Sequence, residues 1–323
     1  MPTRFPASRT VLSLSALALL ITGALLYAGP LDPPAGPVTS TGKTTQEIFD
    51  KVASAEPRTA INAANTPGDA DSLFKITLPG SYYLTGNITG VVGKHGIEIA
   101  ASGVSIDLAG FDLLGVAGSL DGISDTIGAV NVQVRNGSIR DWRDEGVDCT
   151  NSESASVSDV NVRNCFGIGI AIGRYGSVSR CSAVSNGAGG ISTAFNCIVS
   201  ACTVAQNATG GIMATTDCRV VDCTASTNAG SGISAGTGST ISGCAATDNG
   251  ANGIITGNGC TVTNCSANSN NSNGISTGNG CTVVSCTARD NTARGISTNF
   301  NNSGIAVIAF DFSAVATCPS VSP

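Results

Sequence analysis

The chain is poor in the side chains that carry most enzyme chemistry. Its 323 residues include 1 histidine and 1 tryptophan, and charged residues make up 12%. The net charge of −6 comes with no basic patch, which excludes nucleic acid as a partner. His95 has no second histidine to work with. Between Asp222 and Arg289 the only charged residue is Asp248, so this stretch cannot hold a two-carboxylate or metal site.

Glycine is abundant, and it recurs with a fixed period of 21 residues from Gly169 to Ser303. Each unit opens with glycine and isoleucine and carries a cysteine and an asparagine at constant positions, with no insertion or deletion. The glycines are Gly169, Gly190, Gly211, Gly232, Gly253 and Gly274; the cysteines are Cys181, Cys202, Cys223, Cys244, Cys265 and Cys286; the asparagines are Asn186, Asn207, Asn228, Asn249, Asn270 and Asn291. Without a period, this glycine-rich composition would suggest disorder.

The period predicts a solenoid whose units bury their apolar faces only against one another. Apolar residues fall two apart in short bursts such as Cys202-Thr203-Val204, which is the alternation of a strand. Gly, Asn and Ser between the bursts are expected to supply turns with positive φ. Three short strands and three turns per unit make one rung of a parallel β-helix. The isoleucine, valine and cysteine columns then form its core, and the asparagines bond from rung to rung at a corner. The leucine framework of the rival leucine-rich repeat is missing.

The N-terminal segment is typical of an export signal. Arg4 and Arg9 precede an apolar run, Val11 to Leu26, that is short for a membrane span. An uncleaved membrane anchor is the alternative, and only then would the membrane be a partner. The prediction is a secreted, periplasmic or cell-surface protein.

The remaining chain divides by composition and pattern. Thr44 and Glu47 have the spacing of a capping box that opens a short helix, which is expected to cap the N-terminal end of the coil. The predicted segments are 1–28 signal peptide or anchor, 29–43 linker, 44–73 N-terminal cap, 74–303 β-helix, and 304–323 C-terminal cap or tail.

Three segments carry a family resemblance: Gly80-Ser81-Tyr82-Tyr83-Leu84, Val104 to Phe111, and Val134 to Ile139. Together with the repeats, they resemble the right-handed parallel β-helix proteins of the pectin-lyase-like superfamily over roughly residues 74–310. The resemblance implies an all-β, right-handed parallel β-helix with rungs of about 21 residues and a short N-terminal helical cap. It also implies a possible role in polysaccharide chemistry, because the fold includes polysaccharide lyases, glycoside hydrolases and uronan epimerases.

The catalytic strings of those enzymes are missing. The Asn-Thr-Asp, Asp-Asp and Gly-His-Gly motifs of polygalacturonase-like hydrolases do not occur, nor does the Asp-Pro-His-Glu string of the epimerases. Pectate-lyase-like chemistry needs an Asp/Glu cluster for Ca²⁺ and an arginine base. No metal site and no cofactor are predicted, and Ca²⁺ is the one ion that the resemblance leaves open.

One densely charged segment, residues 140–148, provides the low-ranked catalytic candidates. Asp144, Glu145 and Asp148 are acid or base candidates, Arg140 and Arg163 could hold an acidic sugar, and Trp142 could stack on a sugar ring. The competing interpretation is a surface turn whose opposite charges pair, with the tryptophan covering the core. That second interpretation is favoured.

Ten of the 13 cysteines form two columns rather than a metal-ligand pattern. The second column is Cys197, Cys218, Cys260 and Cys281, and an odd total leaves at least one thiol free. Disulfides are conceivable in an exported protein, but buried thiols acting as small apolar residues are favoured.

Two hypotheses for the function remain. The favoured one is a non-catalytic exported β-helix with a structural, adhesive or polysaccharide- or surface-binding role, whose partner is a polysaccharide or a cell-surface component. The alternative is a polysaccharide lyase or glycoside hydrolase that acts on an acidic polysaccharide near residues 140–148.

Overall fold

The computed structural model describes residues 44–48, 51, 56–301 and 303–310. It divides into two compact units, Met1–Ala55 and Glu56–Pro323. The described part of the first unit is a short helix at residues 45–48 and residue 51. The Glu47 N–H donates to Thr44 Oγ1 at 3.1 Å and the Thr44 N–H to Glu47 Oε2 at 2.8 Å, which confirms the capping box. The predicted signal, the linker and Cys318 lie outside the described residues.

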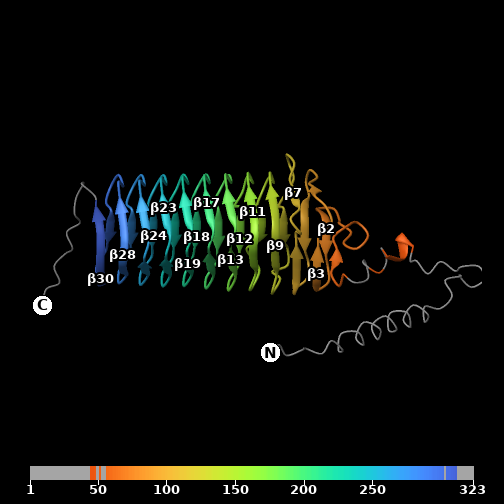
Figure 1. Ribbon diagram of the computed structural model, residues 1–323, viewed down its shortest axis with the longest axis horizontal. Coiled ribbons are helices and arrows are strands. Elements are labelled where there is room, and N and C mark those ends of the chain that lie inside the picture. Colours follow the sequence, from red (N-terminus) through yellow and green to blue (C-terminus); the bar gives the residue numbers. More distant parts are fainter. Residues whose placement is uncertain (1–43, 49–50, 52–55, 302, 311–323) are drawn as a thin grey trace, which may run out of the picture. The chain divides into compact units, whose positions relative to one another are not determined.

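The second unit is a parallel β-helix, and one wall is an 11-stranded sheet with one strand per rung (Figure 1). Its strands are β2 (Ser72–Ile76), β5 (His95–Ile99), β8 (Ile123–Asp125), β10 (Val147–Cys149), β12 (Ile170–Ile172), β15 (Ile191–Thr193), β18 (Ile212–Ala214), β21 (Ile233–Ala235), β24 (Ile254–Thr256), β27 (Ile275–Thr277) and β29 (Ile296–Thr298). No helix among the described residues is long and apolar enough to cross a membrane.

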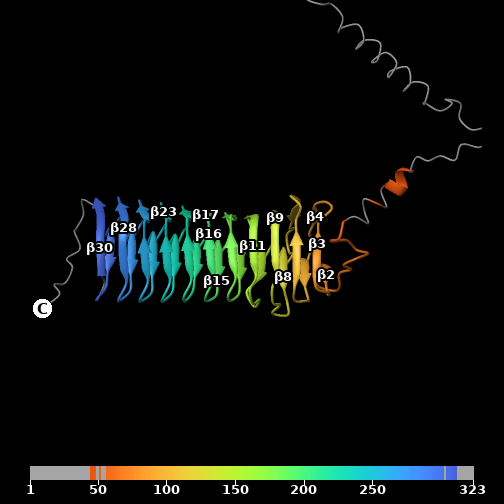
Figure 2. The ribbon, with the colours of Figure 1, turned by 60° about the horizontal axis from the view of Figure 1, so that its bottom comes forward.

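A 19-stranded sheet forms the other two walls, seen beside the first wall in the turned view of Figure 2. The strands of the first of these walls are β1 (Thr59–Ala60), β3 (Gly80–Tyr83), β6 (Val104–Asp107), β13 (Ser177–Ser179), β16 (Ile198–Ser200), β19 (Arg219–Val221), β22 (Thr240–Ser242) and β25 (Thr261–Thr263). Those of the second are β4 (Ile88–Thr89), β7 (Asp112–Leu114), β14 (Ser182–Val184), β17 (Thr203–Ala205), β20 (Thr224–Ser226), β23 (Ala245–Thr247) and β26 (Ser266–Asn268). The longer β9 (Gln133–Arg140), β11 (Ser156–Arg163), β28 (Thr282–Arg289) and β30 (Ser303–Phe310) join these two walls.

The repeat sets the register between rungs. Ile191 pairs with Ile212 and Val199 with Val220, each 21 residues away, so equal positions of successive units lie side by side. The alternation predicted from the sequence is confirmed, because Cys202 and Val204 are buried while Thr203 between them is exposed. The fold is therefore all-β with rungs of about 21 residues, as predicted.

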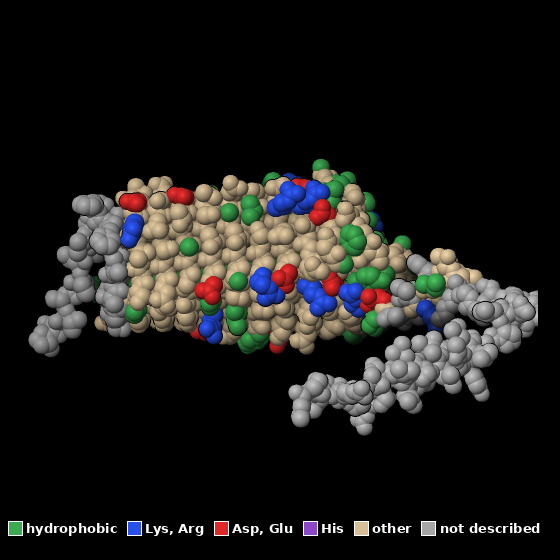
Figure 3. Space-filling view, in the orientation of Figure 1, with side chains coloured by type: hydrophobic (Ala, Val, Ile, Leu, Met, Phe, Trp, Pro, Cys, Tyr) green, Lys and Arg blue, Asp and Glu red, His purple; other side chains and the backbone are tan. Residues whose placement is uncertain are grey.

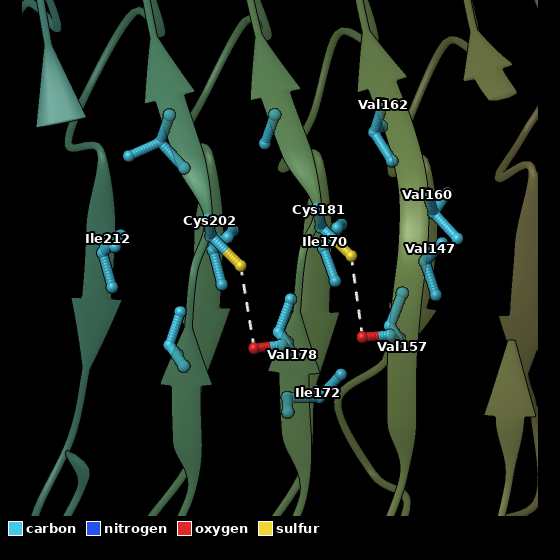
Figure 4. Close-up of a cluster of buried hydrophobic side chains, with 14 of the residues drawn as sticks. Val147, Val157, Val160, Val162, Ile170, Ile172, Val178, Cys181, Cys202 and Ile212 are labelled. Carbon is cyan, nitrogen blue, oxygen red and sulfur yellow. Dashed lines mark hydrogen bonds between the residues drawn. The ribbon is translucent and has the colours of Figure 1, made fainter. Parts of the chain in front are cut away.

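The core consists of columns of small and β-branched side chains (Figure 4). The twelve described cysteines are all buried and form no disulfide with one another, which agrees with the prediction of buried thiols. Cys181 and Cys202 each donate to a carbonyl of the preceding rung, at 3.6 Å from Val157 O and Val178 O. Burial raises the pKa of the Cys149 thiol to about 12, so this thiol stays protonated and unreactive.

The asparagine column lies inside the coil, with the six side chains 1–3% exposed. Asn228 illustrates its bonding: its Oδ1 accepts the Nδ2–H and backbone N–H of Asn207, at 2.9 and 3.1 Å. Its own Nδ2 donates to Asn249 Oδ1 at 3.0 Å and to Val204 O at 3.3 Å. Because every amide group has a partner, the column adds rung-to-rung bonds without a buried polar cost.

The repeated glycines serve this column rather than a turn. A Cβ on Gly211 would lie 2.7 Å from Asn228 Nδ2 and 2.4 Å from Gly232 O, so no larger residue fits. Positive φ occurs instead at three corners that accept varied residues, among them Arg180, Ala201 and Thr227, at φ values of 52–53°. The expectation that Gly, Asn and Ser between the bursts supply positive φ is confirmed at positions such as Gly243, Asn264 and Ser285, whereas close approach is the reason for the repeated Gly-Ile glycines.

Candidate functional site

The charged side chains of the 11-stranded sheet gather on its N-terminal rungs. One outward position per strand forms a register column: Lys75, Glu98, Ser124, Asp148, Ala171, Ser192, Met213, Ser234, Ile255, Ser276 and Ser297. Its charged members all lie on the four rungs of β2, β5, β8 and β10. The remaining outward positions, from Ala171 onward, are uncharged.

A second column carries three residues: His95, which is the first residue of β5, and Asp121 and Glu145, which lie two residues before β8 and β10. The Gly96 N–H donates to Asp121 O at 2.9 Å and the Gly122 N–H to Glu145 O at 3.0 Å, which ties the three positions together along the coil. His95 Nδ1 lies 3.1 Å from Asp121 Oδ2. Asp121 Oδ1 accepts the Glu145 N–H at 2.8 Å. We call His95, Asp121, Asp144 and Glu145 the carboxyl site.

Crowding of carboxyl groups controls protonation at this site. One oxygen from each of Asp121, Asp144 and Glu145 lies within 4.8 Å of the others. Burial, a hydrogen bond with Asp144 and the nearby charges of Asp144, Asp121 and Asp148 raise the pKa of Glu145 to about 8. Burial works to lower the pKa of His95, but its hydrogen bond to Asp121 and the Asp121 charge outweigh burial and raise it. Glu145 thus keeps its proton at neutral pH, beside a histidine whose pKa is raised.

Two acidic groups in the described residues have the spacing of metal ligands, and neither offers a complete calcium shell. At Asp69, Asp71 and Glu98, the Lys75 ammonium already lies 2.7 Å from Asp69 Oδ2 and 2.8 Å from Glu98 Oε1. At the carboxyl site, both Asp121 oxygens are engaged by His95 and by the Glu145 N–H. Calcium prefers six to eight oxygen ligands, so the residues present do not fit a resident Ca²⁺.

The structure separates the candidates of segment 140–148. Asp144 and Glu145 lie together in the carboxyl site. Asp148, on β10, faces outward on the same sheet, and its charge contributes to the shift at Glu145. Arg140, at the end of β9, instead pairs with Asp141 at 2.9 Å and Asp112 at 3.3 Å on a neighbouring wall.

Arg163 is the register partner of Arg140 on β11, so it lies on that neighbouring wall too. The described contacts do not bring either arginine to Glu145. Arg140 therefore pairs with neighbouring carboxylates, as the interpretation of a surface turn with paired charges expects. The role of holding an acidic sugar, suggested for Arg140 and Arg163, has no geometric support.

Trp142 cannot stack on a sugar, because its side chain is 1% exposed. Its Nε1–H donates to Leu113 O at 3.1 Å. The ring lies beneath the glycines of the early rungs: a Cβ on Gly96 would be 2.8 Å from Trp142 Cη2, and one on Gly90 would be 3.0 Å away. The sugar-stacking role is wrong for this residue, which fills the core where the rungs are wider.

Sequence reasoning missed His95 and Asp121. His95 was set aside because it is a lone histidine, and Asp121 lies outside the dense segment. A signal was available: His95, Asp121 and Glu145 each precede a glycine, at Gly96, Gly122 and Gly146. Aligning these three glycines with the later Gly-Ile positions would have placed the three side chains in one column.

Comparison with known proteins supports the fold. A family model described as "Right handed beta helix region" matches residues 193–311. The A-module of the mannuronan C-5 epimerase AlgE6 of Azotobacter vinelandii is similar over 66% of this chain and 68% of its own, with a TM-score of 0.50 and 17% identity. ORF18 of Geobacillus virus E2 is similar over 96% of this chain and 66% of its own, with a TM-score of 0.52 and 10% identity. A search of curated proteins gave no match.

At these identities the similarity shows a shared fold alone. The chain therefore has a right-handed parallel β-helix fold, which confirms the fold that the resemblance implies.

Proposed function

We propose that the protein hydrolyses a polysaccharide at the carboxyl site, with Glu145 as the general acid. The observation that carries the proposal is the arrangement of His95, Asp121 and Glu145 on three successive rungs, with the carboxyl group of Asp144 beside Glu145. A carboxyl that keeps its proton near neutral pH next to other carboxylates is the pair that glycoside hydrolysis uses.

The chemistry needs only these side chains and water. Glu145 donates its proton to the glycosidic oxygen as the bond to the anomeric carbon breaks, and the Asp144 carboxylate stabilises the positive charge that develops on the sugar. Water then supplies a hydroxyl to the anomeric carbon and returns a proton to Glu145.

The charge of the site favours a neutral polymer over an acidic one. Asp121, Asp144, Glu145 and Asp148 surround the reacting position, and His95 is the basic group among them. A uronic chain would meet repulsion from these carboxylates, while the two arginines expected to hold it lie on another wall. We also propose that the protein acts outside the cytoplasm, since residues 1–28 have the pattern of an export signal.

A depolymerisation screen tests the proposal. Purified protein is incubated with laminarin, xylan, galactomannan, polygalacturonate and alginate, with added Ca²⁺ or with EDTA, and reducing ends are measured. We expect turnover of a neutral polymer, insensitive to EDTA and lost above pH about 8 as Glu145 loses its proton. Glu145→Gln should reduce the rate at least about 100-fold.

Glu153→Gln is the matched control, because Glu153 is an exposed carboxylate paired with Arg174 away from the site. Full activity in Glu145→Gln, or turnover of uronic polymers alone, would contradict the proposal. Binding of a polymer without any turnover would instead support the recognition role that the sequence composition favoured.

A further inference from the structure

An exposed aromatic side chain stands at the edge of the carboxyl site. Phe166, in the turn between β11 and β12, is 64% exposed in a chain with 4% aromatic residues. Its backbone is fixed, since the Phe166 N–H donates to Trp142 O at 2.9 Å.

Neighbouring rungs leave one side of this ring open. Arg143, one rung before, places its guanidinium carbon 3.6 Å from the ring centroid of Phe166. The equivalent position one rung later, 21 residues on, is Gly187, which has no side chain to cover the ring. The cation–π contact holds the ring in one orientation while the glycine keeps space beside it.

The turn that carries Phe166 also touches the carboxyl site. The Gly167 N–H donates to Asp144 O at 3.0 Å, and a Cβ on Gly167 would lie 2.9 Å from Glu145 Oε1. The residue after Phe166 thus makes direct contact with both carboxyl-bearing residues. A ligand that reaches Glu145 would have its next unit in the neighbourhood of Phe166.

We propose that Phe166, supported by Arg143, is the stacking platform for a sugar ring adjacent to the bond that Glu145 protonates. This inference rests on the proposed function and extends it with a subsite. The occupant is a pyranose that presents several C–H groups on one face, since these contact an aromatic ring favourably while the hydroxyls stay hydrated. The aromatic role first expected of Trp142 falls to Phe166.

A second exposed aromatic group supplies a matched control. Phe195 is 41% exposed and meets Tyr175 edge to face, with ring centroids 5.5 Å apart and an interplanar angle of 84°. Tyr175 follows β12, whereas Phe166 precedes it, so the pair stands at the opposite end of that strand from the carboxyl site. Truncating either phenylalanine removes a comparable exposed ring.

The test measures binding and turnover separately. Retardation of the protein in native gels containing laminarin or xylan is recorded in the Glu145→Gln background, in which the polymer stays intact. We expect Phe166→Ala to weaken retardation at least about tenfold, Phe195→Ala to leave it unchanged, and Phe166→Trp to restore it with a shift in tryptophan emission on binding. Unchanged circular dichroism shows that the variants remain folded.

Each result has a defined meaning. Retardation that survives Phe166→Ala, or that falls equally in Phe195→Ala, overturns the platform while leaving hydrolysis standing. Phe166-dependent retardation by a polymer that the unmodified protein never cleaves retains the platform and overturns the proposed hydrolysis. No retardation by laminarin or xylan overturns the platform; turnover in the depolymerisation screen would then show that hydrolysis is independent of it.

Discussion

Residues 56–168 and residues 169–301 form the same β-helix with different residue patterns. In the later rungs, the cysteine, asparagine and glycine columns repeat without a break, and the outward position of the 11-stranded sheet is uncharged. In the earlier rungs, the spacings from Gly96 to Gly122, Gly146 and Gly169 are 26, 24 and 23 residues, and the widened interior holds Trp142. Most of the ion pairs described lie here, and Figure 3 shows clusters of opposite charge on a surface that is otherwise mostly uncharged.

The difference teaches how a solenoid can separate stability from chemistry. In the later rungs the members of the inner cysteine, asparagine and isoleucine columns meet copies of themselves, so contacts that satisfy one rung satisfy the next. A repeated charge would meet its own sign about 4.8 Å away, which is costly. Charged groups that act together therefore need rungs that differ, and the earlier rungs provide them.

We expect the largest effect from a substitution that interrupts the asparagine column of the later rungs. Asn228→Ala removes the acceptor of the Asn207 N–H and Nδ2–H and the donor to Val204 O, all of them buried. We expect a loss of about 3 kcal/mol in the free energy of unfolding, measured by urea denaturation.

Asn258→Ala is the control for this change. Asn258 Oδ1 accepts the Asn279 N–H at 2.8 Å in an exposed ladder, where water can replace the lost bond. We expect a loss below about 1 kcal/mol. Equal losses in the two variants would show that the buried column is not the stronger support.

The pH dependence of stability tests the earlier rungs, where the carboxyl site lies. The raised pKa of Glu145, about 8, means that the folded state binds a proton that the unfolded state releases between pH about 4.5 and 8. The stability that this proton contributes is complete below pH about 4.5 and is lost as pH rises through 8. We expect the free energy of unfolding to fall over that window by up to about 1.4 kcal/mol per pH unit.

Glu145→Gln should flatten this slope, and the measurement is urea denaturation at a series of pH values. The carboxyl of Asp159 shows the opposite sign, because its hydrogen bond with Arg180 lowers its pKa and its contribution is lost as pH falls. A slope between pH 5 and 8 that persists in Glu145→Gln would place the responsible group elsewhere.

The smallest expected effect concerns the corners of the later rungs. Ala201 adopts φ 53°, where Gly243 and Asn264 stand at the same corner two and three rungs on. A Cβ is unfavourable there, so Ala201→Gly should raise stability by about 0.5–1 kcal/mol, seen as a higher Tm. Ala205→Gly, within strand β17, should instead lower it by a similar amount. A lower Tm for Ala201→Gly would mean that this corner carries no strain.

The sequence predicted the later rungs better than the earlier ones. The columns of Cys202, Asn228 and Gly211 could be predicted because their period never changes, and the structure places each where the period requires. The reason for the glycine was missed, since the approach of Asn228 Nδ2 to Gly211 involves residues 17 positions apart on different walls. In the candidate site, Glu145 and Asp144 were identified from local charge density, while His95 and Asp121 carried no local signal.

The sequence by itself determined the architecture, because equal rungs can bury their apolar positions only by stacking in register. It also determined that no multi-carboxylate site lies between Asp222 and Arg289, since the side chains are missing there. Only the tertiary structure decided that His95, Asp121 and Glu145 share a column, that Trp142 is buried, and that Phe166 is exposed beside Glu145. These three placements depend on how rungs of unequal length align. Packing and backbone hydrogen bonds between rungs set that alignment, so it cannot be read from any one segment of the sequence.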